Sequence, residues 1–133
     1  MKQKLSIVTL GVSSIEKSKA FYEDLLGFRS TADSNENIIF YDMDGVTLGL
    51  FQREALAKDA SVEAAGSGFR GVTLAHNEPS EAAVDALFAE LREKGVTIVK
   101  APEKVFWGGY SGYFADPDGH LWEVAYNPHT DLT

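Results

Sequence analysis

The residue best placed to do chemistry is Glu123, a carboxylate within an apolar strand pattern at residues 120–126. Because side chains alternate along a strand, one face would carry three bulky groups, which are Trp122, Val124 and Tyr126. That face is typical of core packing, so Glu123 should point to the other side. There it could orient a ligand by accepting a hydrogen bond, or act as a general base if burial raises its pKa. The structural alternative is a solvated side chain or one paired with Arg53 or Arg70.

A tight turn precedes this strand. In Asp116-Pro117-Asp118-Gly119, proline fixes φ, aspartate side chains accept bonds from nearby backbone N–H groups, and glycine tolerates a positive φ. The turn therefore predicts a hairpin that delivers Glu123.

Composition limits the classes of function. The chain has 133 residues, of which 44% are hydrophobic and 24% charged, as in one globular domain. Neither a membrane-spanning run nor a signal-peptide core is visible, so a cytoplasmic location is expected. The lack of cysteine excludes disulfides, thiolate zinc sites and a thiol nucleophile. A net charge of −8 disfavours binding to nucleic acids or anionic membranes, and we expect neither as a partner.

Hydrophobic periodicity predicts the first-half elements. A strand over 5–12 should lead through a Ser13-Ser14-Ile15-Glu16 capping box into a helix that stops at Gly27. Strands are expected at 28–31, 38–42 and 46–51, followed by a partly helical connector at 53–67.

The second half repeats this plan. A strand is expected at 69–76, and Pro79 suits the first turn of a helix that ends at Lys94-Gly95. Its apolar face would hold Val84, Leu87, Phe88 and Leu91. Strands should follow at 96–100, 110–115 and 120–126.

The repeat is also visible in the letters. Residues 40–45 (FYDMDG) match 114–119 (FADPDG) at an offset of 74, and 8–10 match 72–74 (VTL) at an offset of 64. We predict an α+β fold of two βαβββ modules, at about 4–52 and 68–127 within one domain 1–133. The modules should form a curved, barrel-like mixed sheet with a central cleft.

At the offset of 74, Gly49 takes the position in the first repeat that Glu123 takes in the second. If both face the cleft, strand alternation gives the other side chains that should face it. We expect small residues there to leave room for a ligand. The predicted cleft residues are Ile7, Thr9, Thr47, Gly49, Gly71, Thr73 and Glu123. The glycine-rich passage 105–113 adds a rim of Phe106, Trp107 and Tyr110, whose rings could stack on a ligand. These rings could instead complete the core or a subunit interface.

The paired βαβββ plan, the stretch SKAFY at 18–22 leading to LLGF at 25–28, and DPDGHLWE at 116–123 resemble the vicinal oxygen chelate superfamily. That superfamily includes glyoxalase I, extradiol dioxygenases, fosfomycin-resistance enzymes and bleomycin-resistance binding proteins. The resemblance covers nearly the whole chain and implies the fold more strongly than the function.

The resemblance also implies where a metal would bind. Metal-dependent members carry ligands on the first and last strands of each repeat, which correspond here to Ile7, Gly49, Gly71 and Glu123. Only Glu123 can coordinate a metal, and catalytic metal sites usually need at least three protein ligands. Strand parity keeps His76 and His120 off the face of Glu123, and His129 is expected in a tail. We therefore expect no cofactor, with a divalent metal as the alternative.

The sequence thus favours a glyoxalase/bleomycin-resistance-like protein that binds a small organic molecule in a metal-free cleft. The alternative is a glyoxalase-type lyase, isomerase or dioxygenase that uses an unconventional metal site or Glu123 as a base. A third alternative is a regulatory domain whose cleft is vestigial. The resemblance also suggests a homodimer.

Overall fold

A computed structural model describes residues 1–133, which divide into two compact units, Met1–Gly68 and Phe69–Thr133. Each unit contains one of the expected repeats. None of the helices is both long and apolar enough to cross a bilayer.

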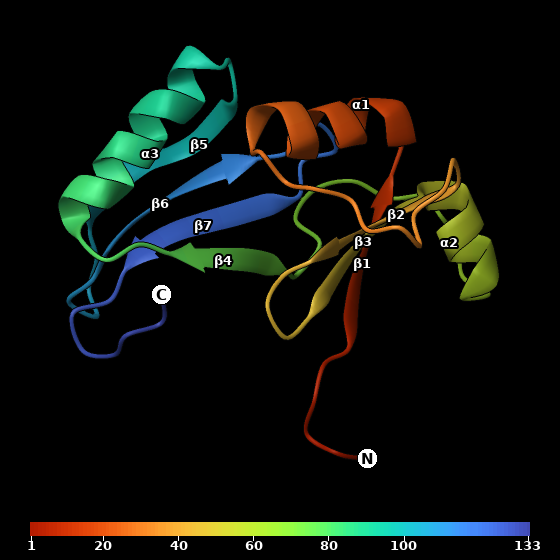
Figure 1. The fold of residues 1–133 in the computed structure, drawn as a ribbon, viewed down its shortest axis with the longest axis horizontal. Coiled ribbons are helices and arrows are strands. Elements are labelled where there is room, and N and C mark those ends of the chain that lie inside the picture. The colour runs from red at the N-terminus through yellow and green to blue at the C-terminus, as the bar shows by residue number, and fades with distance from the viewer. The chain divides into compact units, whose positions relative to one another are not determined.

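The first unit is a three-stranded sheet with helices (Figure 1). Its elements are β1 (Ile7–Val12), α1 (Ile15–Ala20), the π-helix η1 (Phe21–Leu25), β2 (Ile38–Asp42), β3 (Thr47–Gln52) and α2 (Arg53–Asp59). The strand order is β1-β3-β2, with β1 parallel and β2 antiparallel to β3. The parallel β1–β3 pair and the intervening helix are the core of a βαβββ module.

An aromatic cluster joins the helices of this unit to its sheet. Tyr22 of η1 is fully buried, and its ring centroid lies 6.0 Å from that of Tyr41 and 5.8 Å from that of Phe28. The same face of the sheet carries other buried apolar side chains, namely Leu10, Val12, Ile39, Leu48 and Leu50. The opposite face, which carries Thr9 and Gly49, is therefore not the core face.

Two local predictions for this unit were wrong. The helix cap is Ser14 rather than Ser13, because the Ser14 hydroxyl accepts from Lys17 N at 3.2 Å. Residues 28–31 form only an isolated bridge, between Ser30 and Tyr41. The physical reason is that Ser34 Oγ accepts from Phe40 N at 2.8 Å, so the loop occupies the strand edge that a fourth strand would use.

The second unit is a four-stranded sheet with one long helix. Its elements are β4 (Thr73–Asn77), α3 (Glu81–Glu93), β5 (Thr97–Lys104), β6 (Tyr110–Ala115) and β7 (Leu121–Tyr126). The strand order is β4-β7-β6-β5, with β4 parallel to β7 and the other pairs antiparallel. Helix α3 contacts β5, β6 and β7 and lies across one face of this sheet (Figure 1).

The core of the second unit lies between α3 and the sheet. Val84, Phe88 and Leu91 of α3 are at most 1% exposed, as the predicted helical face requires. On the sheet, the Phe114 and Trp122 rings stack with centroids 6.2 Å apart, and Val124 is fully buried. The bulky face of β7 is therefore packing surface, which confirms the strand alternation that singled out Glu123.

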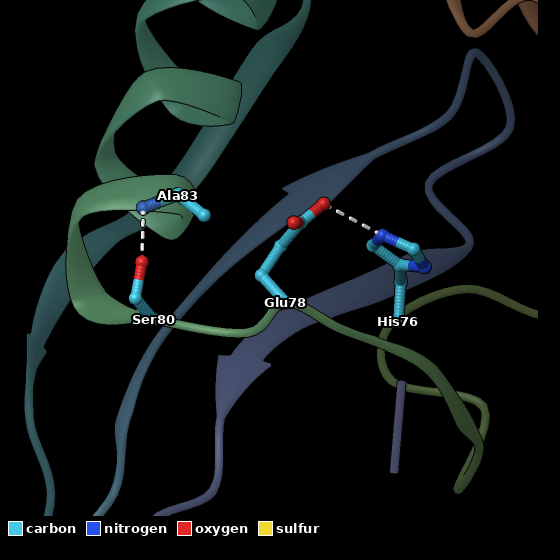
Figure 2. Close-up of polar contacts among 4 residues, drawn as sticks. All are labelled: His76, Glu78, Ser80 and Ala83. Atoms are coloured by element: carbon cyan, nitrogen blue, oxygen red, sulfur yellow. Dashed lines mark hydrogen bonds and ion pairs between the residues drawn. The ribbon is translucent and has the colours of Figure 1, made fainter. Parts of the chain in front are cut away.

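Element ends in this unit differ from the predictions. Strand β4 begins at Thr73 and not at residue 69, because Gly71 has a φ of 77° that interrupts an extended chain. Pro79 precedes α3, whose cap is Ser80 with its hydroxyl accepting from Ala83 N at 3.1 Å (Figure 2). Strand β5 extends to Lys104, past the predicted end at Lys100, through two register shifts.

The two sheets share one plan, since β1-β3-β2 and β4-β7-β6 have the same order and directions. The repeated α+β architecture is confirmed. Each sheet is open, so barrel-like closure stays a prediction.

Candidate functional site

Glu123 lies on the face of the four-stranded sheet that points away from α3. Two residues of the adjacent strand β6 lie on the face that α3 covers. A β-carbon on Gly112 would meet Phe88 of α3. The Tyr110 hydroxyl donates to Asp85 of α3 at 2.7 Å. Side chains alternate, so Tyr113 of β6 points away from α3. Its direct partner across the ladder is Glu123, which therefore shares that open face.

A line of polar side chains crosses this face from β5 to β7. Lys100 pairs with Tyr113, and Tyr113 pairs with Glu123. Tyr113 and Glu123 lie directly opposite each other across the ladder, and the Glu123 carboxylate acts on the pKa of the Tyr113 hydroxyl. Lys100 Nζ lies 2.9 Å from Glu103 Oε1. We call Lys100, Glu103, Tyr113 and Glu123 the Glu123 row.

Two members of the row, Tyr113 and Lys100, have raised pKa values. Burial, followed by the charge and the hydrogen bond of Glu123, raises the pKa of Tyr113, while nearby Lys100 acts in the opposite direction. The hydrogen bond with Glu103 raises the pKa of Lys100, against a smaller lowering by burial. Tyr113 is therefore a neutral hydrogen-bond donor, and Lys100 is a cation already engaged by Glu103.

Glu123 retains the capacity to bind a ligand. An ionised carboxylate offers about four lone-pair positions, and the single hydroxyl of Tyr113 can fill only one of them. Glu123 is only partly buried, and its other lateral neighbour is Ala75, whose methyl group makes no hydrogen bond. The row can thus accept hydrogen bonds from a ligand at the Glu123 carboxylate, beside the Tyr113 hydroxyl.

Sequence reasoning did not identify Lys100, Glu103 or Tyr113 as site residues. A signal for Tyr113 was present, since the hairpin around residues 116–119 pairs Ala115 with Leu121, and two further steps pair Tyr113 with Glu123. No comparable signal existed for Lys100, because register shifts flank its pairing with Tyr113.

The predicted aromatic rim separates into three environments. Tyr110 lies on the α3 side and is not on the face of Glu123. The Trp107 ring lies against Gly109, where a β-carbon would overlap it. Phe106 is fully exposed at the tip between β5 and β6.

Four of the predicted cleft residues lie together on the first unit's sheet. Thr9 pairs with Gly49 and Ile7 with Thr47, on the face away from the aromatic core. Gly49 also pairs with Phe40, and a β-carbon there would lie 3.3 Å from Thr9 Oγ1 and 3.5 Å from the Phe40 ring. The space beside the counterpart of Glu123 is thus taken by an aromatic ring.

Gly71 and Thr73 differ in their placement. Gly71 lies outside β4, whereas Thr73 pairs with Leu121, two residues before Glu123. In the first unit Ile7 pairs with Thr47, two residues before Gly49. The ladders therefore equate Ile7 with Thr73, while the repeated VTL letters equate it with Gly71.

The residues present do not fit a family-type metal. Of the positions that the resemblance assigns to ligands, Ile7, Gly49 and Gly71 have no donor side chain, and Thr73 would add only a neutral hydroxyl. Among residues 1–133, no three His, Cys, Asp or Glu side chains are grouped so that they could hold an ion. Glu123 is the one strong donor of that set.

A separate polar groove of about 310 Å³ lies at the C-terminal end of the second unit. It is lined by residues 77–79 and 126–133, none of which is a predicted cleft residue. At its margin, His76 Nε2 lies 2.8 Å from Glu78 Oε1 (Figure 2). His76 pairs with Val124, so strand alternation places it on the face opposite Glu123.

Known proteins share this fold. A glyoxalase-related enzyme from Fulvimarina pelagi superposes with a TM-score of 0.88 at 34% identity, over 99% of this chain and 94% of that one. Lactoylglutathione lyase from Agrobacterium tumefaciens has a TM-score of 0.74 at 19% identity, over 95% of each chain. The metallothiol transferase FosB of Lysinibacillus sphaericus (strain C3-41) is 27% identical over 122 residues, which are 91% of this chain and 80% of that protein.

The family model for the Glyoxalase/Bleomycin resistance protein/Dioxygenase superfamily matches residues 4–124. This match spans both repeats and includes Glu123. The chain therefore belongs to the Glyoxalase/Bleomycin resistance protein/Dioxygenase superfamily.

Proposed function

We propose that this protein binds a small organic molecule at the Glu123 row, without the metal of its metal-dependent relatives. The observation that carries the proposal is the alignment of Lys100, Tyr113 and Glu123 on neighbouring strands, on the face that α3 leaves open. Strands hold side chains more rigidly than loops do, so this arrangement is suited to selecting a ligand by its hydrogen-bonding groups.

The donor chemistry supports binding without a metal. Glu123 has a hydrogen-bond donor on one side and a methyl group on the other, where a metal site would need further N or O ligands. The carboxylate that relatives use as a ligand position is here available to the bound molecule itself.

A second candidate is an enzyme of glyoxalase type, a lyase or isomerase in which Glu123 removes a proton from the bound molecule. The contact of Glu123 with Tyr113 favours it, because a base and a neutral donor then lie side by side. The protein from Lysinibacillus sphaericus is by its name a metallothiol transferase, and the structural neighbour from Agrobacterium tumefaciens is by its name a lyase. If this candidate is correct, Glu123→Gln will abolish turnover while binding persists.

The proposal can be tested with a fragment library and amide-resolved NMR. We expect fragments to shift the amide signals of Tyr113 and Glu123, and Glu123→Gln to weaken the best of them roughly ten- to hundredfold, the effect of losing a hydrogen bond to a charged group. Tyr113→Phe should weaken the same fragments less, because it removes only a neutral hydroxyl beside Glu123.

Tyr110→Phe is the matched control. It removes a tyrosine–carboxylate hydrogen bond from the same strand, but on the side of α3. Fragment affinity should not change in this variant. Equal affinity of wild type and Glu123→Gln, or shifts that map to the α3 side instead, would refute the proposal.

The expected homodimer and cytoplasmic location stay predictions from the sequence. A sedimentation or light-scattering measurement addresses the first.

A further inference from the structure

We infer that the molecule bound by the Glu123 row carries a positively charged nitrogen, such as an amine or a guanidine. This inference rests on the proposed function and names the chemical class of its ligand. It follows from the charges that this face of the sheet presents.

The open face has an excess of one negative charge. Its charged side chains are Lys100, Glu103 and Glu123. Lys104 is not one of them, because it pairs with Tyr110 and its Nζ lies 3.9 Å from Glu81 of α3, on the other side of the sheet. Lys100 and Glu103 form an ion pair at 2.9 Å and offset each other. Lys100 also interacts with the charge of Glu123, but one lysine cannot balance two carboxylates, so one negative charge of the row remains unbalanced.

Tyr113 leaves this charge in place. A phenol donates a hydrogen bond to a carboxylate but does not neutralise it, and the pKa of Tyr113 is raised, so the phenol stays a donor. The best complement of a carboxylate with free acceptor positions is a charged donor, since charge-assisted hydrogen bonds are about twice as strong as neutral ones. A protonated nitrogen provides both the charge and the donor.

An anionic ligand would meet the opposite conditions. Its one attractive partner in the row, Lys100, is already held by Glu103, and both Glu103 and Glu123 would repel it. The net charge of −8 over the whole chain adds a long-range preference for cations at low salt.

Three phenyl compounds with a cationic, a neutral and an anionic head group test this inference: benzylamine, benzyl alcohol and benzoate. In NMR titrations at low salt, benzylamine should shift the Tyr113 and Glu123 amides with an affinity roughly tenfold or more above that of benzoate. Glu123→Gln keeps the shape of the side chain and removes its charge, so the advantage of benzylamine over benzyl alcohol should disappear.

Glu103→Gln makes the complementary test. Removing this carboxylate frees Lys100 from its ion pair, so benzoate should gain affinity relative to benzylamine. Spectra of the free variants show whether each is folded before any titration.

The possible failures are distinguishable. If benzoate binds this face as tightly as benzylamine or more tightly, the charge inference is wrong while the proposed binding site stands. If none of the three probes shifts these amides, the proposed function fails and the inference fails with it.

Discussion

Replacing Gly112 with alanine will lower the free energy of unfolding by about 3 kcal/mol or more, at the upper end of what overpacking costs. A β-carbon at this position would lie 2.7 Å from Lys100 O, 2.8 Å from Pro102 N and 2.8 Å from Phe88 Cζ. Two of these atoms belong to the backbone of β5, so no side-chain rotation can relieve the overlap. Urea denaturation followed by circular dichroism will measure the change.

The same substitution should disturb the Glu123 row. Gly112 precedes Tyr113 in β6, and its lack of a side chain lets β5, which carries Lys100, pack closely against it. Gly11→Ala is the matched control on β1, because its β-carbon would meet neighbours only at 3.4 Å or more. If Gly112→Ala proves as stable as Gly11→Ala, the close packing of β5 on β6 described above is incorrect.

Asp116→Ala should destabilise the protein by about 3 kcal/mol, because it removes two hydrogen bonds to a charged acceptor. Asp116 is 5% exposed, and its Oδ1 accepts from Asp118 N at 2.9 Å and His120 N at 2.8 Å. Without these bonds, two backbone N–H groups in a partly buried turn lose their acceptor. The loss can be measured by chemical denaturation.

The chain contains its own control for this experiment. Asp42 begins the corresponding turn of the first repeat, but it is exposed and its Oδ1 accepts one bond, from Asp44 N at 3.1 Å. Asp42→Ala should therefore change stability little. Asp116→Asn keeps the oxygen acceptor and should retain most of the stability. An Asp116→Ala variant as stable as Asp42→Ala would contradict the role assigned to this turn.

The fold was largely predictable because strong local signals agreed with each other. The turn at residues 116–119, the helical spacing of Val84, Phe88 and Leu91, and the repeated letters each indicated the observed elements. The failures occurred where side chains competed with the backbone pattern. Ser34 bonds the edge of β2 at Phe40, and Gly71 adopts a positive φ that delays β4.

The site was predictable only in part. Alternation along one strand identified the open face of Glu123, since that inference needs no information about other strands. Lys100 could not be found because the β5–β6 ladder shifts register on both sides of it. The position of Tyr110 on the α3 side could not be foreseen, because a glycine-rich loop does not indicate which face of the sheet the first side chain of the next strand will occupy.

The two repeats keep one backbone plan but differ in chemistry. Across the first sheet the corresponding positions are Thr9, Gly49 and Phe40, and across the second they are Ala75, Glu123 and Tyr113. A ring fills the space at Gly49, while a carboxylate with a tyrosine as its cross-strand partner occupies the position of Glu123. Of these corresponding positions, the carboxylate and the phenol both belong to the second repeat.

The binding of an organic molecule at the Glu123 row without a metal is the proposal with the most direct test. It is tested most directly by titrating the benzyl probes into protein treated with a chelator and into the same protein given one equivalent of zinc. We expect equal affinities and the same shifted amides, at Tyr113 and Glu123, in both samples. Binding that appears only with zinc, and that Glu123→Gln removes together with the zinc, would contradict it.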